Sequence, residues 1–76
     1  MKEAIFNKLA EITECDDLNM DTQLKSLDLW DSLSTISFLV YAKSKLGVQF
    51  ENVEVINKAE TVSDLIDLTI ERMNKS

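Results

Sequence analysis

The fold is decided by the stretch LWDSLSTISFLVYAKSKLG, which spans residues 29–47. Its apolar residues recur at helical spacing and form a broad stripe. The stripe comprises Leu33, Ile36, Leu39, Val40 and Leu46, thickened by Phe38, Tyr41 and Ala42. A helix that is apolar over so wide an arc is expected at the centre of a bundle, in contact with several neighbours. Asp31 or Ser32 can cap its first turn, and Gly47 is a suitable residue to end it.

Amphipathic helices are predicted on both sides of this central helix. Residues 2–14 place Ile5, Leu9 and Ile12 at positions i, i+4 and i+7, which share one helix face. Residues 61–64, Thr-Val-Ser-Asp, have the pattern of a capping box and begin a last helix. The inward face of that helix is expected to comprise Val62, Leu65, Ile66, Thr69, Ile70 and Met73.

The segments between these helices complete the prediction. Residues 15–31 show no sustained period, so we expect a long loop whose scattered leucines lie across the core. Loops longer than about 12–15 residues are uncommon in compact domains and are often functional. Residues 52–57 are expected to form a single helical turn. The predicted fold is all-α, a small four-helix bundle with three main helices, one short helix and a long loop between the first two.

Size and composition favour one small domain over residues 1–76. A chain of this length buries only about 60% of its unfolded surface, but 45% of its residues are hydrophobic. The absence of proline and the single glycine argue against a β-sandwich and against disorder. Cys15 has no partner for an internal disulfide, which fits a cytoplasmic location, and we expect it to pack rather than to react. The chain has no apolar run near 18 residues, so no membrane span is expected.

Several kinds of chemistry are excluded by the residues that the chain lacks. Without histidine it can build neither a Ser-His-Asp triad nor a histidine zinc site, and one cysteine is too few for a thiolate site. The net charge of −6 opposes binding to nucleic acid. An acidic loop, Asp17-x-Asn19-x-Asp21, echoes an EF-hand loop, but Thr22 and Asp28 stand where that loop needs glycine and glutamate. We therefore expect neither enzymatic activity nor a metal site.

Ser32 is the residue whose position indicates chemistry. It follows a long loop and begins a helix, so its hydroxyl is expected to face solvent. A phosphate attached there would meet free backbone N–H groups and the positive end of the helix dipole. The alternative is that Ser32 only caps the helix, as serine commonly does.

With its neighbours, Ser32 resembles the modification site of the acyl carrier protein family, and the resemblance covers nearly the whole chain. The matching features are the first helix, the long loop and a set of residues: Leu24, Leu27, Asp31-Ser32-Leu33, Ile36, Gly47-Val48-Gln49-Phe50 and residues 61–66. The resemblance implies that Ser32 carries a 4′-phosphopantetheine arm, transferred from coenzyme A by a separate phosphopantetheinyl transferase. It also implies that Asp31 and Leu33 flank the serine in the motif which that enzyme reads.

The implied function is that of a carrier. The thiol of the arm would hold an acyl or aminoacyl group as a thioester, loaded by a ligase or transferase and consumed by a downstream synthase. The tether keeps the substrate at high effective concentration near each partner. Docking to these partners is expected to involve Trp30, Ser34, Ile36 and Ser37, next to Ser32. Trp30 could equally cover the ends of the helices.

The sequence departs from the family pattern in two places. Many members have glycine where Leu29 stands, and Trp30 resembles a variant subset. In fatty-acid-synthesis members the second helix is strongly acidic and docks basic partners, whereas residues 32–50 contain no Asp or Glu and include Lys43 and Lys45. We therefore predict a carrier for a specialised biosynthetic pathway.

Other functions remain as alternatives to this prediction. Within the carrier class they are a general fatty-acid carrier and an aminoacyl carrier. A different class is a small helical interaction module that binds a partner helix through the apolar edge of residues 30–41. A hydrolase with Ser32 as nucleophile lacks a histidine base.

Overall fold

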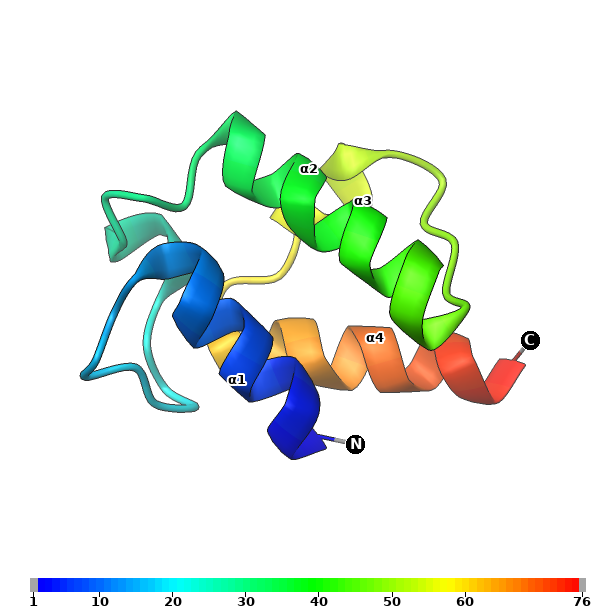
Figure 1. Ribbon diagram of the computed structural model, residues 1–76, viewed down its shortest axis with the longest axis horizontal. Helices are drawn as coiled ribbons and strands as arrows, with labels where there is room; N and C mark the ends of the chain where they lie inside the picture. The colour runs from blue at the N-terminus through cyan, green and yellow to red at the C-terminus, as the bar shows by residue number, and fades with distance from the viewer. Residues whose placement is uncertain (1, 76) are drawn as a thin grey trace.

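The computed structural model describes residues 2–75, which form an all-α bundle (Figure 1). Its helices are α1 (Lys2–Thr13), α2 (Ser32–Tyr41), α3 (Val53–Asn57) and α4 (Val62–Lys75). A 3₁₀ turn, η1 (Leu24–Ser26), interrupts the loop before α2, and a π-helical turn, η2 (Ala42–Leu46), extends α2. The all-α prediction is confirmed, including the short third helix and the long loop between α1 and α2.

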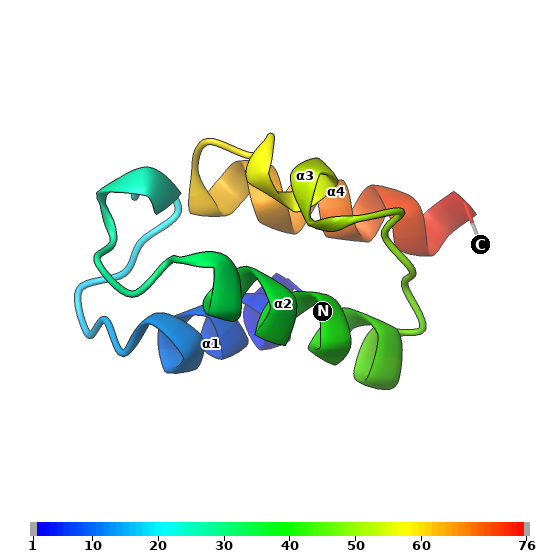
Figure 2. The ribbon, with the colours of Figure 1, turned by 90° about the horizontal axis from the view of Figure 1, so that it is seen from above.

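The core lies where α1 packs against α2 and α4, and where α3 packs against α2. Figure 2 shows α3 and α4 along one side of the molecule and α1 and α2 along the other. Phe38 of α2 is fully buried, and its ring lies 6.4 Å from Phe50, 6.1 Å from Tyr41 and 6.4 Å from Trp30 between centroids. Aromatic side chains bury more area than any others, so Phe38 anchors this small core.

Local sequence explains where α1 and α2 end. Glu14 takes a left-handed backbone, with φ 51°, and the N–H of Cys15 reaches back to the carbonyl of Ala10 at 3.3 Å. Gly47, which follows η2, also takes a left-handed backbone, with φ 68°. Glycine adopts this conformation without the steric cost of a Cβ. The predicted stop at Gly47 is confirmed.

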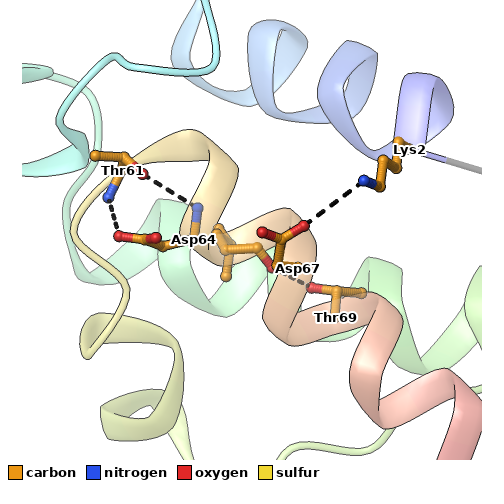
Figure 3. A network of polar contacts seen from close by, with 6 residues as sticks. Lys2, Thr61, Asp64, Asp67 and Thr69 are labelled. Carbon is orange, nitrogen blue, oxygen red and sulfur yellow. Dashed lines mark hydrogen bonds and ion pairs between the residues drawn. The ribbon is translucent and has the colours of Figure 1, made fainter.

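The start of α4 is held by two sets of hydrogen bonds. Thr61 and Asp64 form the predicted capping box: the Asp64 N–H donates to Thr61 Oγ1 at 3.1 Å, and the Thr61 N–H donates to Asp64 Oδ2 at 3.3 Å (Figure 3). The long loop supplies the rest, because the carbonyls of Met20 and Thr22 accept from the next N–H groups of α4, at 2.9 and 3.0 Å. The long loop is therefore tied to α4 along its backbone.

The buried face of α4 is the one that its periodicity predicts. Val62, Leu65, Ile66 and Thr69 are buried, and Ile70 and Met73 are half-buried. The hydroxyl of Thr69 donates to the carbonyl of Leu65 at 2.8 Å, so this buried polar group is satisfied within the helix (Figure 3).

The face that α2 and η2 turn to the core matches the predicted stripe only in part. Leu39, Tyr41 and Leu46 pack half-buried against the core. Leu33, Ile36 and Val40 are 74%, 49% and 53% exposed, whereas Thr35, Phe38 and Ala42 are buried. An apolar run leaves several faces available, and here the phenyl ring of Phe38 takes the interior, as the largest fully buried side chain. Thr35 is buried on the same face at a low cost in free energy, because its hydroxyl donates to the carbonyl of Asp31 at 2.9 Å.

The prediction for the loop leucines is correct only in part. Leu18 and Leu24 are buried, and Leu27 is half-buried. Met20 and Leu29 are exposed, at 36% and 43%. The loop is therefore fixed to the core at two leucines, and its backbone bonds to α4 hold the rest.

Candidate functional site

Ser32 is the first residue of α2, at the end of the long loop, and it is exposed. The helix is capped by the residue before it, because the carboxylate of Asp31 accepts the N–H of Ser34 at 3.0 Å. Asp31 has an extended backbone, with φ −116° and ψ −167°, as a capping residue requires. Among the described residues, the Ser32 hydroxyl has no hydrogen-bond partner. Of the two capping candidates, Asp31 is the cap, and the Ser32 hydroxyl takes no part in capping.

The electrostatic environment of Ser32 is set by Asp31. The hydrogen bond from the backbone N–H of Ser34 holds the pKa of Asp31 below its ordinary value, and this effect outweighs the opposing effect of burial. One prediction needs correction here, because the N–H of Ser34 is already used. A phosphate on Ser32 would share the positive end of α2 with an ionised carboxylate, instead of meeting a fully vacant helix end.

The turn that presents Ser32 is fixed from both sides. The hydroxyl of Ser34 donates to the carbonyl of Leu29, and the N–H of Trp30 donates to the carbonyl of Leu27 at 3.0 Å. Trp30 is half-buried, and its ring meets Phe38 edge to face. Trp30 thus covers the end of the helices, which was one of its two predicted roles. The serine is therefore an exposed group on a rigid support.

The other predicted site residues lie along the first two turns of α2. Leu33 is beside Ser32 and is largely exposed, and Ile36 and Ser37 are exposed one turn further on. Ser34 is half-buried by its bond to the loop, so it offers less surface than expected. Their role in docking stays a prediction.

Sequence reasoning missed one residue that supports the site. Thr35 is buried, and besides Asp31 its hydroxyl lies 3.4 Å from Asn57 Oδ1, which links α2 to α3. No local signal marks it, because Ser34 and Ser37 are also polar and the buried face of α2 does not follow from its period. A buried polar residue of this kind is usually held by a hydrogen bond.

The remaining candidates form no site. Cys15 is half-buried and packs against the core, as expected. In the acidic loop, Asn19 Oδ1 accepts the N–H of Asp21 at 2.8 Å, so it serves the turn. Within residues 2–75 no group of three His, Cys, Asp or Glu side chains is placed to hold a metal ion. No described helix has both the length and the apolar character needed to cross a membrane.

Comparison with known proteins gives one match. The model of a family described as phosphopantetheine attachment site matches residues 3–69, from α1 into α4. The matched span includes the turn of Asp31 and Ser32. Neither the curated proteins nor the solved structures gave a significant match.

Proposed function

The chain belongs to the phosphopantetheine attachment site family, whose members carry covalently attached 4′-phosphopantetheine, and on that premise we propose that Ser32 carries the arm. One observation supports this choice above others: the Ser32 hydroxyl is exposed and unbonded at the start of α2, while Asp31 does the capping. The nearby Ser34 hydroxyl is already bonded to Leu29. Ser37 is exposed but lies within α2, away from the loop that precedes the helix.

The modification is a transfer to this chain by another enzyme. The Ser32 oxygen forms a bond to the phosphorus that bears pantetheine, the phosphoanhydride bond of coenzyme A breaks, and the nucleotide leaves. The serine proton must pass to a base on the transferase, because the chain has no histidine. Asp31 and Leu33, on either side of the serine, are exposed and available to that enzyme.

The proposed role of the modified chain is to carry acyl or aminoacyl groups as thioesters on the thiol of the arm. Loading would come from a ligase or acyltransferase, and a synthase would take the group. The domain presents the substrate and adds no chemistry of its own. The gain is effective concentration, because a tethered group meets a docked active site repeatedly.

We propose further that the pathway is a specialised one. Support comes from α2 and η2, where residues 32–50 contain no acid and Lys43 and Lys45 are exposed. A basic docking patch of the kind that fatty-acid enzymes use would find no carboxylate there. A general fatty-acid carrier and an aminoacyl carrier remain the alternatives within this class.

The attachment site is tested by intact mass after incubation with coenzyme A and a broad-specificity phosphopantetheinyl transferase. We expect the wild type and Ser37→Ala to gain one arm and Ser32→Ala to gain none. Ser37→Ala is the matched control, since it removes another exposed hydroxyl from the same helix.

Thermal unfolding of Ser32→Ala shows whether this variant is folded, so that a failure to gain the arm cannot be due to unfolding. Because Asp31 is the cap and the Ser32 hydroxyl makes no hydrogen bond, the free energy of unfolding of Ser32→Ala should lie within about 0.5 kcal/mol of the wild-type value. Loss of a cap would cost more. A modified Ser32→Ala protein would show that another residue carries the arm. An unmodified wild type would favour the helical interaction module instead.

A further inference from the structure

We infer that the outer face of α2 docks a partner protein whose contact face is apolar at its centre and acidic at its edge. The outer α2 face comprises Leu33, Ile36 and Val40 of α2 and Lys43 of η2, which recur at intervals of three, four and three residues. Residues at this spacing share one side of a helix. The inference deepens the proposed function, since it names the chemistry of the partner that meets the arm.

The apolar part of this face is larger than folding requires. Leu33, Ile36 and Val40 are 74%, 49% and 53% exposed, and they account for three of the five large hydrophobic side chains that are exposed among the described residues. Single exposed apolar side chains are ordinary, but a row of three on one helix forms a patch. None of the three belongs to the core cluster, so their exposure points to a contact made with another molecule.

A hollow of about 400 Å³ lies beside the row, between α1 and the second half of α2. Val40, Ile12 and Tyr41 border it together with Ser37 and Ser44, and most of the surface that lines it is apolar. Lys8 and Lys45 stand at the same hollow, one from α1 and one from η2. An apolar side chain of a partner could enter here while carboxylates around it meet the lysines.

The charges decide which partner fits. Lys43 and Lys45 are exposed, and the structure shows no ion pair for either of them. Lys8 is partly engaged, 3.4 Å from Glu11 and 5.4 Å from the centroid of the Tyr41 ring. The carboxylate at the other end of the face is Asp31, which caps the helix. Although the chain has a net charge of −6, residues 32–50 contain no Asp or Glu beside Lys43 and Lys45, so an acidic rim is complementary to this face and a basic one is not.

The position of the face suits delivery from Ser32. Leu33 is adjacent to Ser32, and at about 1.5 Å of rise per residue Val40 lies about 12 Å along the helix from it. A partner seated on this face would therefore have the attachment point at the edge of its footprint. The arm could then enter a neighbouring cleft of that partner.

The probe for this inference is a pair of synthetic amphipathic helices with identical leucine stripes, one flanked by glutamates and the other by lysines. Their binding to the full chain is followed by NMR shifts of the backbone amides. We expect the glutamate peptide to shift amides of the outer α2 face and to bind there more tightly than the lysine peptide. Net charge alone predicts the reverse order, because the chain is acidic.

Two charge-matched variants sharpen the test. The double variant Lys43→Glu/Lys45→Glu should lower the affinity for the glutamate peptide roughly tenfold. The control Lys25→Glu/Lys58→Glu makes the same change in net charge at exposed lysines outside α2 and η2. It should lower the affinity for the glutamate peptide no more than about twofold. Equal losses in both variants would overturn the inference.

Two other outcomes would also overturn it. One is tighter binding of the lysine peptide to the same amides. The other is a concentration-dependent dimer in sedimentation that buries the α2 amides, since a second copy would then be the occupant. The peptide assay does not depend on the Ser32 hydroxyl and can be repeated with Ser32→Ala. A failed arm transfer and a failed docking surface are therefore told apart.

Discussion

Helices α4 and α2 use their apolar residues in opposite ways. In α4 the apolar positions lie on one face, and that face is the buried one: Val62, Leu65 and Ile66 are all fully buried. In α2 and η2 the apolar residues run around the helix: Phe38 and Ala42 are buried with Thr35, and Leu39, Tyr41 and Leu46 pack half-buried against the core. Leu33, Ile36 and Val40 form the exposed row.

This difference separates residues that hold the fold from residues that are free to serve binding. An amphipathic helix has no apolar side chain to spare, because each one buried contributes about 1.5–3 kcal/mol to a small core. A helix with more apolar residues than the core can accept exposes the surplus. In α2 the surplus begins directly after Ser32, and this proximity links the row to the carrier role.

The largest expected effect is on stability. Leu65→Ala in α4 removes a fully buried side chain and should lower the free energy of unfolding by about 2–5 kcal/mol. The same change at Leu33, which is 74% exposed, should stay within about 0.5 kcal/mol. Urea unfolding followed by circular dichroism compares the two directly. A cost of 2 kcal/mol at Leu33 would mean that the outer α2 face serves the fold, and the comparison would fail.

Much of the fold could be predicted from the sequence because local signals agree with tertiary packing. The Thr61–Asp64 box, the stop at Gly47 and the face of α4 all follow from residues next to one another in the chain. The buried face of α2 could not be predicted in this way. Its period is compatible with several faces, and which face is buried depends on Phe38 meeting Trp30 from the loop before α2 and Phe50 from the segment after η2.

For the candidate site too, some features could be predicted from the local sequence and others needed the structure. The position of Ser32 at the start of a helix follows from the local sequence, and the resemblance to a carrier family agrees with the family match. The choice between Asp31 and Ser32 as the cap needed the backbone conformation of Asp31. The hollow beside Val40 could not be foreseen, because it is made by α1 and α2 together.

The second expected effect is on partner recognition. The wild type should be a poor substrate for a fatty-acid malonyl transferase, because the basic patch of that enzyme meets Lys43 and Lys45 and no acid on α2. Changing Ser37, Lys43 and Lys45 to Glu should raise kcat/KM roughly tenfold, mainly through association. Ser34 is left unchanged, since its hydroxyl holds Leu29.

Steady-state kinetics of the arm-bearing proteins measure this effect. Lys25→Glu/Lys58→Glu again serves as the control, because it adds negative charge away from α2. An unaltered protein that matches an ordinary acidic carrier in this assay would contradict the specialised pathway. It would leave the attachment of the arm to Ser32 untouched.

The smallest expected effect concerns the starts of the two helices. The N–H groups in the first turn of α4 donate to the hydroxyl of Thr61 and to the backbone carbonyls of Met20 and Thr22, none of which is a carboxylate. The first turn of α2 depends on the carboxylate of Asp31, which accepts the N–H of Ser34. Acid should therefore weaken the start of α2 through Asp31.

The sign follows from the pKa of Asp31, which the Ser34 N–H lowers below its ordinary value of 3.8 in the folded chain. The stabilisation is complete above that ordinary value and is lost as the pH falls through the lowered pKa. Asp31→Asn keeps an oxygen that can accept the Ser34 N–H but cannot titrate, so its melting temperature should fall less than that of the wild type between pH 5 and pH 2. Asp28→Asn, at an exposed acid that caps no helix, is the control and should follow the wild type. Parallel curves for Asp31→Asn and the wild type would show that the α2 cap is as insensitive to acid as the start of α4, and the contrast between the two helix starts would be lost.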